Sequence, residues 1–418
     1  MDRKRIIPIF AVVFTNILGA GVILPILPLL AEGEFQATAL QATTLSAVFF
    51  AAQFVAAPWL GRISDRVGRR PVLIVSQIGT VLSFILFIFA APLGRMIDGW
   101  GISLGITGGL FMLYVARLLD GITGGNITTA QAYIADVSTP QTRAQALGMI
   151  SAAFGLGFIF GPAFGGFLAG INLVAPFVGA AIITSGSVLL TIFMLTESLP
   201  PEARAAESDA APAQSKIPTS QFLRQPNVFR ILVIAFVVTL AFAALQSTFA
   251  LYAERVIFPE LSHAQVARNT GLILAAVGVT SVITQLFFIK SLVQRLGEFK
   301  VAILGQISLS IAFIGLSSIS SPPLAALFIV PLAFGNSVNE PNLQAILTRN
   351  SDGRTRGRLL GLYQSARSLA LIFGPIWAGY TFQTIGPRAP FAIAAPVVLV
   401  AIALTILLQR RDISAPAT

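Results

Sequence analysis

Apolar stretches of about 20 residues recur along the whole chain, and each could cross the hydrocarbon core of a bilayer as one helix. Inside lipid only helices and closed barrels satisfy every backbone hydrogen bond, and stretches this long favour helices. The pattern therefore predicts an all-α integral membrane protein with twelve transmembrane helices. The predicted spans are 6–30, 39–60, 71–92, 107–135, 143–169, 175–196, 228–253, 269–290, 300–319, 323–347, 358–383 and 388–409.

The composition supports this class and excludes several others. Hydrophobic residues make up 55% of the chain and charged residues 11%, whereas a soluble domain carries about 25% charged residues. There is no cysteine, and His263 is the single histidine, so neither a disulfide framework nor a multi-histidine metal site can form. We expect no metal and no cofactor. The sequence contains no phosphate-binding loop and no plausible catalytic triad, so we do not expect an enzyme.

The net charge of +10 would suggest nucleic acid in a soluble protein, but here its distribution matters more. With the N-terminus inside, most Lys and Arg residues fall in the predicted cytoplasmic segments, as the positive-inside rule requires. The first span follows Arg3, Lys4 and Arg5 and lacks a cleavage site, so we interpret it as a retained helix. Both termini are expected in the cytoplasm. Short cytoplasmic extensions favour a bacterial inner membrane.

The two halves of the sequence repeat each other. The segment RAQALGMISAAFGLGFIFGPAFGG from Arg143 aligns with RGRLLGLYQSARSLALIFGPIWAG from Arg356 at one constant offset. A weaker repeat pairs Gly68 with Gly297. We therefore predict two pseudo-symmetric six-helix halves, 1–196 and 228–418, joined by a cytoplasmic linker, 197–227, which is rich in Pro, Ala, Glu and Ser. Such duplication suits alternating access to a site at the bilayer midplane.

Three segments carry a family resemblance. GRISDRVGRRPVL, between spans two and three, resembles the signature loop of the major facilitator superfamily. ARLLDGITGG in span four resembles the arginine motif of its proton-coupled members, and GLGFIFGPAFGG in span five resembles the Gly/Pro motif of its drug exporters. Over nearly its whole length the chain is most similar to the tetracycline/proton antiporter branch of the twelve-span drug:H+ antiporters. The resemblance implies a major facilitator fold and export of drugs against protons.

The sequence departs from that branch at its membrane acids. The branch carries acids in its first, third and ninth spans, and the matching positions here are Asn16, Ser83 and Leu309. Tetracycline–metal export through those acids is therefore not expected, and the substrate of the branch is not carried over.

Four charged residues fall inside predicted spans, where a charge at the bilayer centre costs roughly 2.5–3.5 kcal/mol. Arg117 and Asp120 are three residues apart on span four and can pair, and Glu340 in span ten can pair with Arg367 in span eleven. We predict that these four residues couple transport to protons. A static ion pair that holds helices together is the alternative, and for Glu340 substrate contact also stays open.

Spans one, four, seven and ten line the cavity in the family that the chain resembles. Amides, aromatic rings and acids in these spans suit amphipathic and cationic molecules. The predicted substrate-binding residues are Asn16, Asn126, Gln131, Phe242, Gln246, Phe249, Asn336, Asn339 and Glu340. For any single Phe, lipid contact is the simpler interpretation.

Two groups of residues are predicted to act in gating. Ion pairs between the signature loop and Asp136 would lock one conformation and break in the other; the alternative is that the loop arginines only hold the loop inside. Small residues on spans five and eleven allow close helix packing. The predicted gating residues are Gly61, Asp65, Arg66, Gly68, Arg69, Arg70, Asp136, Gly157, Gly161, Pro162, Gly374 and Pro375.

The leading functional hypothesis is a monomeric, proton-coupled exporter of small amphipathic compounds. The expected partners are a small-molecule substrate, protons and the lipid bilayer, without nucleic acid. A proton-coupled sugar or metabolite transporter, motivated by the cavity amides and the missing acids, is the second hypothesis. A lipid transporter or membrane receptor of the same fold is the third.

Overall fold

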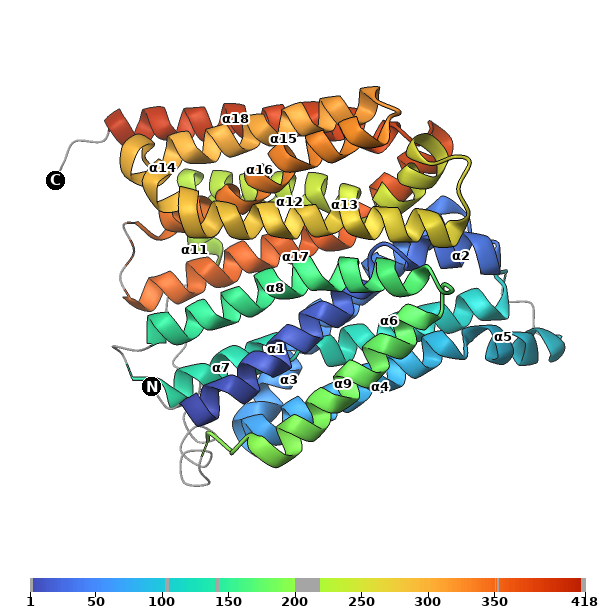
Figure 1. Ribbon diagram of the computed structural model, residues 1–418. Helices are drawn as coiled ribbons and strands as arrows, with labels where there is room; N and C mark the ends of the chain where they lie inside the picture. Colours follow the sequence, from blue (N-terminus) through green and yellow to red (C-terminus); the bar gives the residue numbers. More distant parts are fainter. Residues whose placement is uncertain are drawn as a thin grey trace. The chain divides into compact units, whose positions relative to one another are not determined.

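The computed structural model describes residues 3–101, 105–139, 143–199, 219–349, 351 and 353–414. All regular secondary structure in these residues is helical (Figure 1). By contact the chain divides into two compact units. Unit 1 comprises Met1–Ala213 and Glu260–Ala275, and unit 2 comprises Gln214–Pro259 and Ala276–Thr418. Most of the predicted linker, 200–218, lies outside the described residues, and the predicted domain boundaries stay predictions.

The helices follow the predicted spans. The first nine are α1 (Arg3–Ile23), α2 (Leu27–Phe35), α3 (Ala39–Val67), α4 (Arg69–Ile88), α5 (Ala90–Gly99), α6 (Gly108–Gly124), α7 (Ile127–Val137), α8 (Arg143–Ala169) and α9 (Ala175–Met194). The later ones are α11 (Thr219–Leu223), α12 (Pro226–Tyr252), η1 (Ala253–Ile257), α13 (His263–Ile283), η2 (Thr284–Phe288), α14 (Ile289–Leu296), α15 (Glu298–Ser318), α16 (Pro322–Thr348), α17 (Gly353–Thr384) and α18 (Ala389–Ser414).

Each of the twelve predicted spans coincides with one helix or with one interrupted helix, so the predicted fold class is confirmed. Among the described residues, eight helices are by themselves long and apolar enough to cross a membrane. A ninth span forms when α1 and α2 are joined across their 42° bend. Pro25 and Pro28 lie at this bend, where proline removes backbone donors and opens the helix ladder.

Both units use the same packing scheme. In unit 1, α1 packs against α8 and α9, and α4 packs against α6 and α9. In unit 2, α12 packs against α17 and α18, and α15 packs against α16 and α18. Each helix of the first set has its counterpart in the second, as the internal sequence repeat predicts.

Glycines set the close approach of α1 to α8. A Cβ atom at Gly161 would lie 2.8 Å from the Cα of Gly21, and one at Gly157 would lie 2.7 Å from the Ile17 side chain. In the repeat, a Cβ at Gly374 of α17 would lie 2.5 Å from the Cβ of Ala243 in α12. Small residues therefore let the helix backbones touch, which replaces the hydrophobic drive that lipid does not supply.

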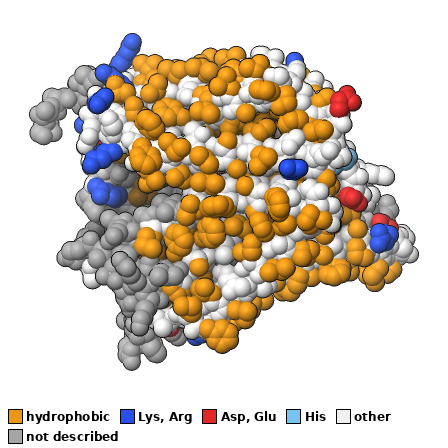
Figure 2. Space-filling view, viewed as in Figure 1, with side chains coloured by type: hydrophobic (Ala, Val, Ile, Leu, Met, Phe, Trp, Pro, Cys, Tyr) orange, Lys and Arg blue, Asp and Glu red, His pale blue; other side chains and the backbone are white. Residues whose placement is uncertain are grey.

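Large apolar side chains cover the outside of the helices. Phe193 is 81% exposed and Val55 is 74% exposed, which in water would mark an aggregation-prone surface. Figure 2 shows hydrophobic side chains over most of the face in view. We call the end of unit 1 that carries Arg62, Arg66, Arg69 and Arg70, at the junction of α3 and α4, its basic end. Together with the spans, this surface defines a multi-pass membrane protein.

Candidate transport site

Arg117 and Asp120, both on α6, are buried charges inside a predicted membrane span. Their side chains are 7% and 8% exposed, and Arg117 Nη1 lies 2.9 Å from Asp120 Oδ2. The guanidinium also donates through Nε to the Leu45 carbonyl at 3.3 Å and lies 4.2 Å above the Phe49 ring, both on α3. The structure thus brings together the pair that the three-residue spacing predicts. Removing one partner would leave the other charge buried and unpaired.

Asp120 also faces α4. The Ser83 hydroxyl lies within hydrogen-bonding reach of the Asp120 carboxylate, and it donates to the Thr80 carbonyl at 2.8 Å. Ser83 is one of the three positions at which the tetracycline branch carries an acid. The carboxylate in this chain therefore lies across a helix interface from that position.

The helix that carries the pair is interrupted in its middle. The single predicted span 107–135 is divided into α6 and α7 by a turn at Gly125 and Asn126, so the expectation of one continuous helix is wrong. Gln53 of α3 donates to the Gly124 carbonyl at 2.9 Å, and Asn16 of α1 donates to Asn126 Oδ1 at 2.7 Å. These amides satisfy backbone and side-chain groups that the interruption frees inside the bundle.

In unit 2, Glu340 of α16 pairs with Arg367 of α17, as the sequence predicts. The Gln344 amide donates to the same carboxylate oxygen at 3.2 Å. The Glu340 side chain is 43% exposed, and that of Arg367 is 23% exposed. This pair is therefore much less desolvated than Arg117–Asp120.

The remaining predicted substrate residues differ in exposure. Gln131 on α7 is exposed, and Asn16, Phe242, Gln246 and Asn336 are partly buried. The others lie in the interior: Asn126 and Asn339 are each 2% exposed, and Phe249 is fully buried. Phe249 contacts the Tyr252 ring, with centroids 6.2 Å apart, and Asn339 donates to the Gly335 carbonyl at 2.7 Å. Phe249 is thus placed in the core of unit 2.

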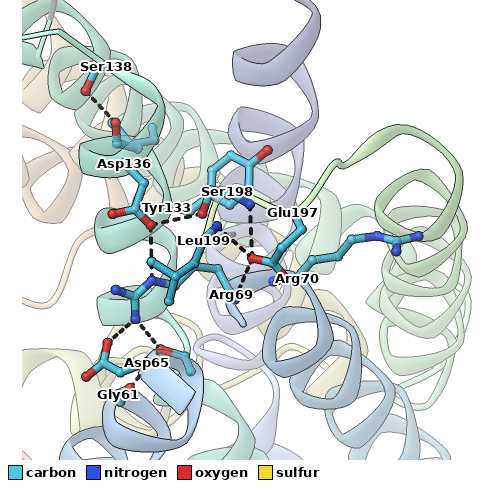
Figure 3. A network of polar contacts seen from close by, with 12 residues as sticks. Gly61, Asp65, Arg69, Arg70, Tyr133, Asp136, Ser138, Glu197, Ser198 and Leu199 are labelled. Carbon is cyan, nitrogen blue, oxygen red and sulfur yellow. Dashed lines mark hydrogen bonds and ion pairs between the residues drawn. The ribbon is translucent and has the colours of Figure 1, made fainter. Parts of the chain in front are cut away.

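A polar network lies at the basic end of unit 1 (Figure 3). The Arg69 side chain pairs with Asp65, donates through Nε to Asp136 Oδ2 at 3.2 Å, and donates to the Ser64 hydroxyl at 2.8 Å. The expected link from the loop to Asp136 is therefore present, and its arginine is Arg69. Arg66 is exposed.

Sequence reasoning missed Glu197. Its carboxylate accepts the backbone N–H groups of Arg69 at 2.9 Å and Arg70 at 3.3 Å, at the start of α4. A carboxylate at a helix N-terminus is favoured by the unpaired N–H groups and the helix dipole. The Ser198 hydroxyl also donates to Asp136 at 3.0 Å. The sequence signal for this contact is the position of Glu197 directly after span six, because an anion there can reach the N-terminus of a neighbouring helix.

The predicted gating glycines have distinct environments. Gly68, between α3 and α4, has φ 114°, and its repeat partner Gly297 has φ 80°, values that favour glycine. A Cβ at Gly61 would meet nothing within 4 Å. Pro162 and Pro375 lie within α8 and α17, one residue after Gly161 and Gly374.

A duplicated helical fold with charges buried inside membrane spans is typical of membrane transporters. The family model of the Major Facilitator Superfamily matches residues 9–264 and 256–418, so the chain belongs to this superfamily. It is a transporter and not an enzyme.

Curated relatives are resistance proteins. The tetracycline resistance protein class C of Escherichia coli is 31% identical over 377 residues, which cover 90% of this chain and 89% of the relative. Multidrug resistance protein 2 of Bacillus subtilis is 29% identical over 416 residues, covering 98% and 97%. These relatives are consistent with the drug:H+ antiporter branch that the motifs indicate.

Solved structures share the fold. The human organic anion transporter MFSD10 (TETRAN) superimposes with a TM-score of 0.67 at 23% identity, covering 96% of this chain and 99% of that one. A bacterial homologue of the human lysosomal transporter Spinster, in an inward-facing and unoccupied conformation, gives 0.72 at 17% identity, with full coverage of both chains.

Proposed function

We propose that the protein exports small amphipathic compounds in exchange for protons, by alternating access in a bacterial inner membrane. The observation that carries the proposal is Asp120, an acid buried with Arg117 in the interior of unit 1. A carboxylate in such a site changes its proton affinity whenever its solvation or its pairing changes. A conformational cycle that changes the solvation or the pairing of this carboxylate can therefore exchange a proton for a substrate. The names of the resistance relatives support the direction of transport.

The other predicted residues take supporting roles in this proposal. Asn16, Asn126 and Gln131 offer polar contacts to the substrate in unit 1, and Glu340 with Asn336 does so in unit 2. Arg69, with Asp65, Asp136 and Glu197, is proposed to hold unit 1 in one conformation until these contacts break. Both termini are proposed to lie in the cytoplasm.

The test uses purified protein in proteoliposomes with an imposed pH gradient and a fluorescent lipophilic cation as probe. We expect gradient-driven movement of the probe with the native chain and its loss in Asp120→Asn. Glu340→Gln is the comparison variant, since it neutralises the other membrane acid: the rate should fall with the lost substrate contact, but the movement that remains should still depend on the pH gradient. Movement that survives in Asp120→Asn but is lost in Glu340→Gln would assign the proton to Glu340. Absence of movement with the native chain would count against drug export.

A metabolite symporter is the second candidate, and the buried amide pair Asn16–Asn126 favours it, because amides suit sugar hydroxyl groups. The direction of movement separates the two candidates: a symporter accumulates its substrate on the side to which protons flow, whereas an antiporter depletes that side.

A further inference from the structure

One face of α4 carries a buried polar stripe that the proposed function does not explain. Gln77, Thr80 and Ser83 follow each other at three-residue spacing and are 3%, 4% and 0% exposed. We call these three residues the α4 polar stripe. Its Ser83 end lies against Asp120. Polar side chains in a membrane helix are costly unless they are bonded or hydrated.

Two contacts fix the register of this stripe against the interrupted helix. Ser83 faces Asp120, and the Thr80 hydroxyl lies 3.3 Å from the Thr123 hydroxyl. The two helices are antiparallel, so a step of three residues back along α4, from Ser83 to Thr80, matches a step of three residues forward along α6, from Asp120 to Thr123. The next step of three brings Gln77 level with Asn126, at the turn between α6 and α7.

Helices α9 and α1 complete a cluster at this level. The Gln77 amide donates to the Ser187 hydroxyl of α9 at 2.9 Å, and the Thr15 hydroxyl of α1 donates to the same oxygen at 2.8 Å. The next residue on α1, Asn16, bonds Asn126. Amides and hydroxyls from α1, α4, α9 and the α6–α7 turn thus form two bonded groups at about the same level of unit 1, Gln77–Ser187–Thr15 and Asn16–Asn126.

Hydrogen-bonding groups are left unpartnered around this cluster. The buried atoms without a partner among the described residues include Gln77 Oε1, Asn126 Nδ2, Thr129 Oγ1 and Thr184 Oγ1. Thr129 lies in the first turn of α7, and Thr184 lies one turn from Ser187 on α9. Each such group costs roughly 1–3 kcal/mol if it stays dry. Donors and acceptors are both left over, and all are neutral, which suits water better than an ion of either sign.

We propose that ordered water fills this cluster and, with the α4 polar stripe, forms the route by which protons reach Asp120 from the Asn16 side. The inference rests on the proposed proton coupling. Toward the basic end an apolar cluster that includes Ile9, Val13, Leu73 and Tyr133 closes the interior, whereas Asn16 is only partly buried. Water therefore enters on the Asn16 side and not from the basic end.

The proton balance of the route is simple. Each water molecule or hydroxyl along the route accepts a proton from the neighbour nearer Asn16 and donates its own proton to the neighbour nearer Asp120. The Asp120 carboxylate accepts the final proton. No bond other than O–H changes, and nothing is oxidised or reduced. The Gln77 amide holds water by its free oxygen and does not relay the proton, so Gln77 is a positioning residue.

Unit 2 supplies a matched control. Gln306 stands at the same distance from Gly297 as Gln77 does from Gly68, and it is fully buried on α15. Its amide donates to the Thr405 hydroxyl at 3.0 Å, and its oxygen accepts from that hydroxyl at 3.1 Å. Each amide atom of Gln306 thus has a partner, whereas Gln77 Oε1 has none among the described residues.

The experiment compares Gln77→Met with Gln306→Met in proteoliposomes, using the same lipophilic cation. Two rates are measured: transport driven by the pH gradient, and counterflow of the cation without a gradient, which needs no net proton movement. For Gln77→Met we expect gradient-driven transport to fall about tenfold, the effect of one lost hydrogen bond on a rate, while counterflow stays native. Gln306→Met should leave both rates unchanged.

A second variant keeps the test decisive if Gln77→Met does not fold. Thr184→Val removes one unpartnered hydroxyl at constant shape. If the cluster holds water, the variant slows gradient-driven transport and spares counterflow. If the cluster is dry, the variant melts at a higher temperature than the native protein and transports normally, which overturns the inference.

The outcomes also separate this inference from the proposed function. Equal losses of both rates in Gln77→Met would assign Gln77 a structural role and overturn the inference, as would native rates in both Gln77→Met and Thr184→Val. In those cases, loss of gradient-driven transport in Asp120→Asn would keep proton coupling intact. If the native protein shows no gradient dependence at all, the proposed function and the inference fail together.

Discussion

At the scale of single residues, the charge pair of α6 is the most predictable feature of the site. Two opposite charges three residues apart on one apolar helix can hardly avoid pairing, and Arg117 and Asp120 do pair. Their neighbours were not predictable in the same way. Phe49, Leu45 and Ser83 reach the pair from α3 and α4, and only the packing of these helices places them there.

The pair gives a stability prediction. Arg117→Leu leaves the Asp120 carboxylate buried without a partner, and we expect a loss of about 3–5 kcal/mol in the free energy of unfolding. The double variant Arg117→Leu/Asp120→Asn removes the orphaned charge and should recover most of this loss without restoring transport. Thermal unfolding in detergent measures both. A double variant as unstable as the single one would show that the charge itself is not the cause.

At the scale of helices, periodic hydrophobicity predicts existence and order well, but interruptions poorly. Each of the twelve predicted spans coincides with a helix or an interrupted helix, and prolines lie at the bend after α1. The turn between α6 and α7 has no proline. The sequence GGN at 124–126 carries the signal, but glycines also serve helix packing, as Gly121 does against the backbone of Phe49. Composition by itself does not separate these two uses.

The junction of α3 and α4 gives a prediction for an element. Gly68 has φ 114°, where a side chain is strained, so Gly68→Ala should destabilise the protein by about 1–3 kcal/mol. It should also weaken the pairing of Arg69 with Asp65 and Asp136 by shifting the start of α4. Gly61→Ala is the control, since a Cβ there meets nothing within 4 Å. Thermal unfolding separates the two variants, and equal melting temperatures would contradict the conformational argument.

The packing of α1 on α8 gives a second prediction at the scale of helices. A side chain at Gly161 would collide with the backbone of Gly21, 2.8 Å from its Cα, and helices cannot separate without losing their contacts. Gly161→Val should therefore abolish transport and reduce the yield of folded protein. Gly186→Ala on α9, where a Cβ meets nothing within 4 Å, should be tolerated. Transport in proteoliposomes and monodispersity in detergent report on both variants.

At the scale of the whole molecule, the internal repeat links sequence to structure. Gly68 and Gly297 both adopt positive φ, and Gln77 and Gln306 both bond a hydroxyl on the helix packed against them. The repeat therefore predicted a shared packing scheme. The halves differ in the burial of their membrane acids: Asp120 is nearly fully buried, whereas the Glu340 side chain is 43% exposed. The sequence predicts the duplicated scaffold and the two membrane acids. It does not predict how deeply each acid is buried, because burial depends on how the helices pack.

The proposed orientation of the chain in the membrane rests on its charge distribution, and it can be tested directly because the chain has no cysteine. Single cysteines at Arg66 and Gln294, which are exposed near the starts of α4 and α15, should react with an impermeant maleimide only from the cytoplasmic side. A cysteine at Trp100, which is 68% exposed after α5, should react only from outside. Right-side-out vesicles expose the outer face of the membrane to the maleimide, and inside-out vesicles expose the cytoplasmic face. Labelling of Arg66→Cys and Gln294→Cys from opposite sides would contradict two halves of six spans each, since an even number of crossings separates these positions.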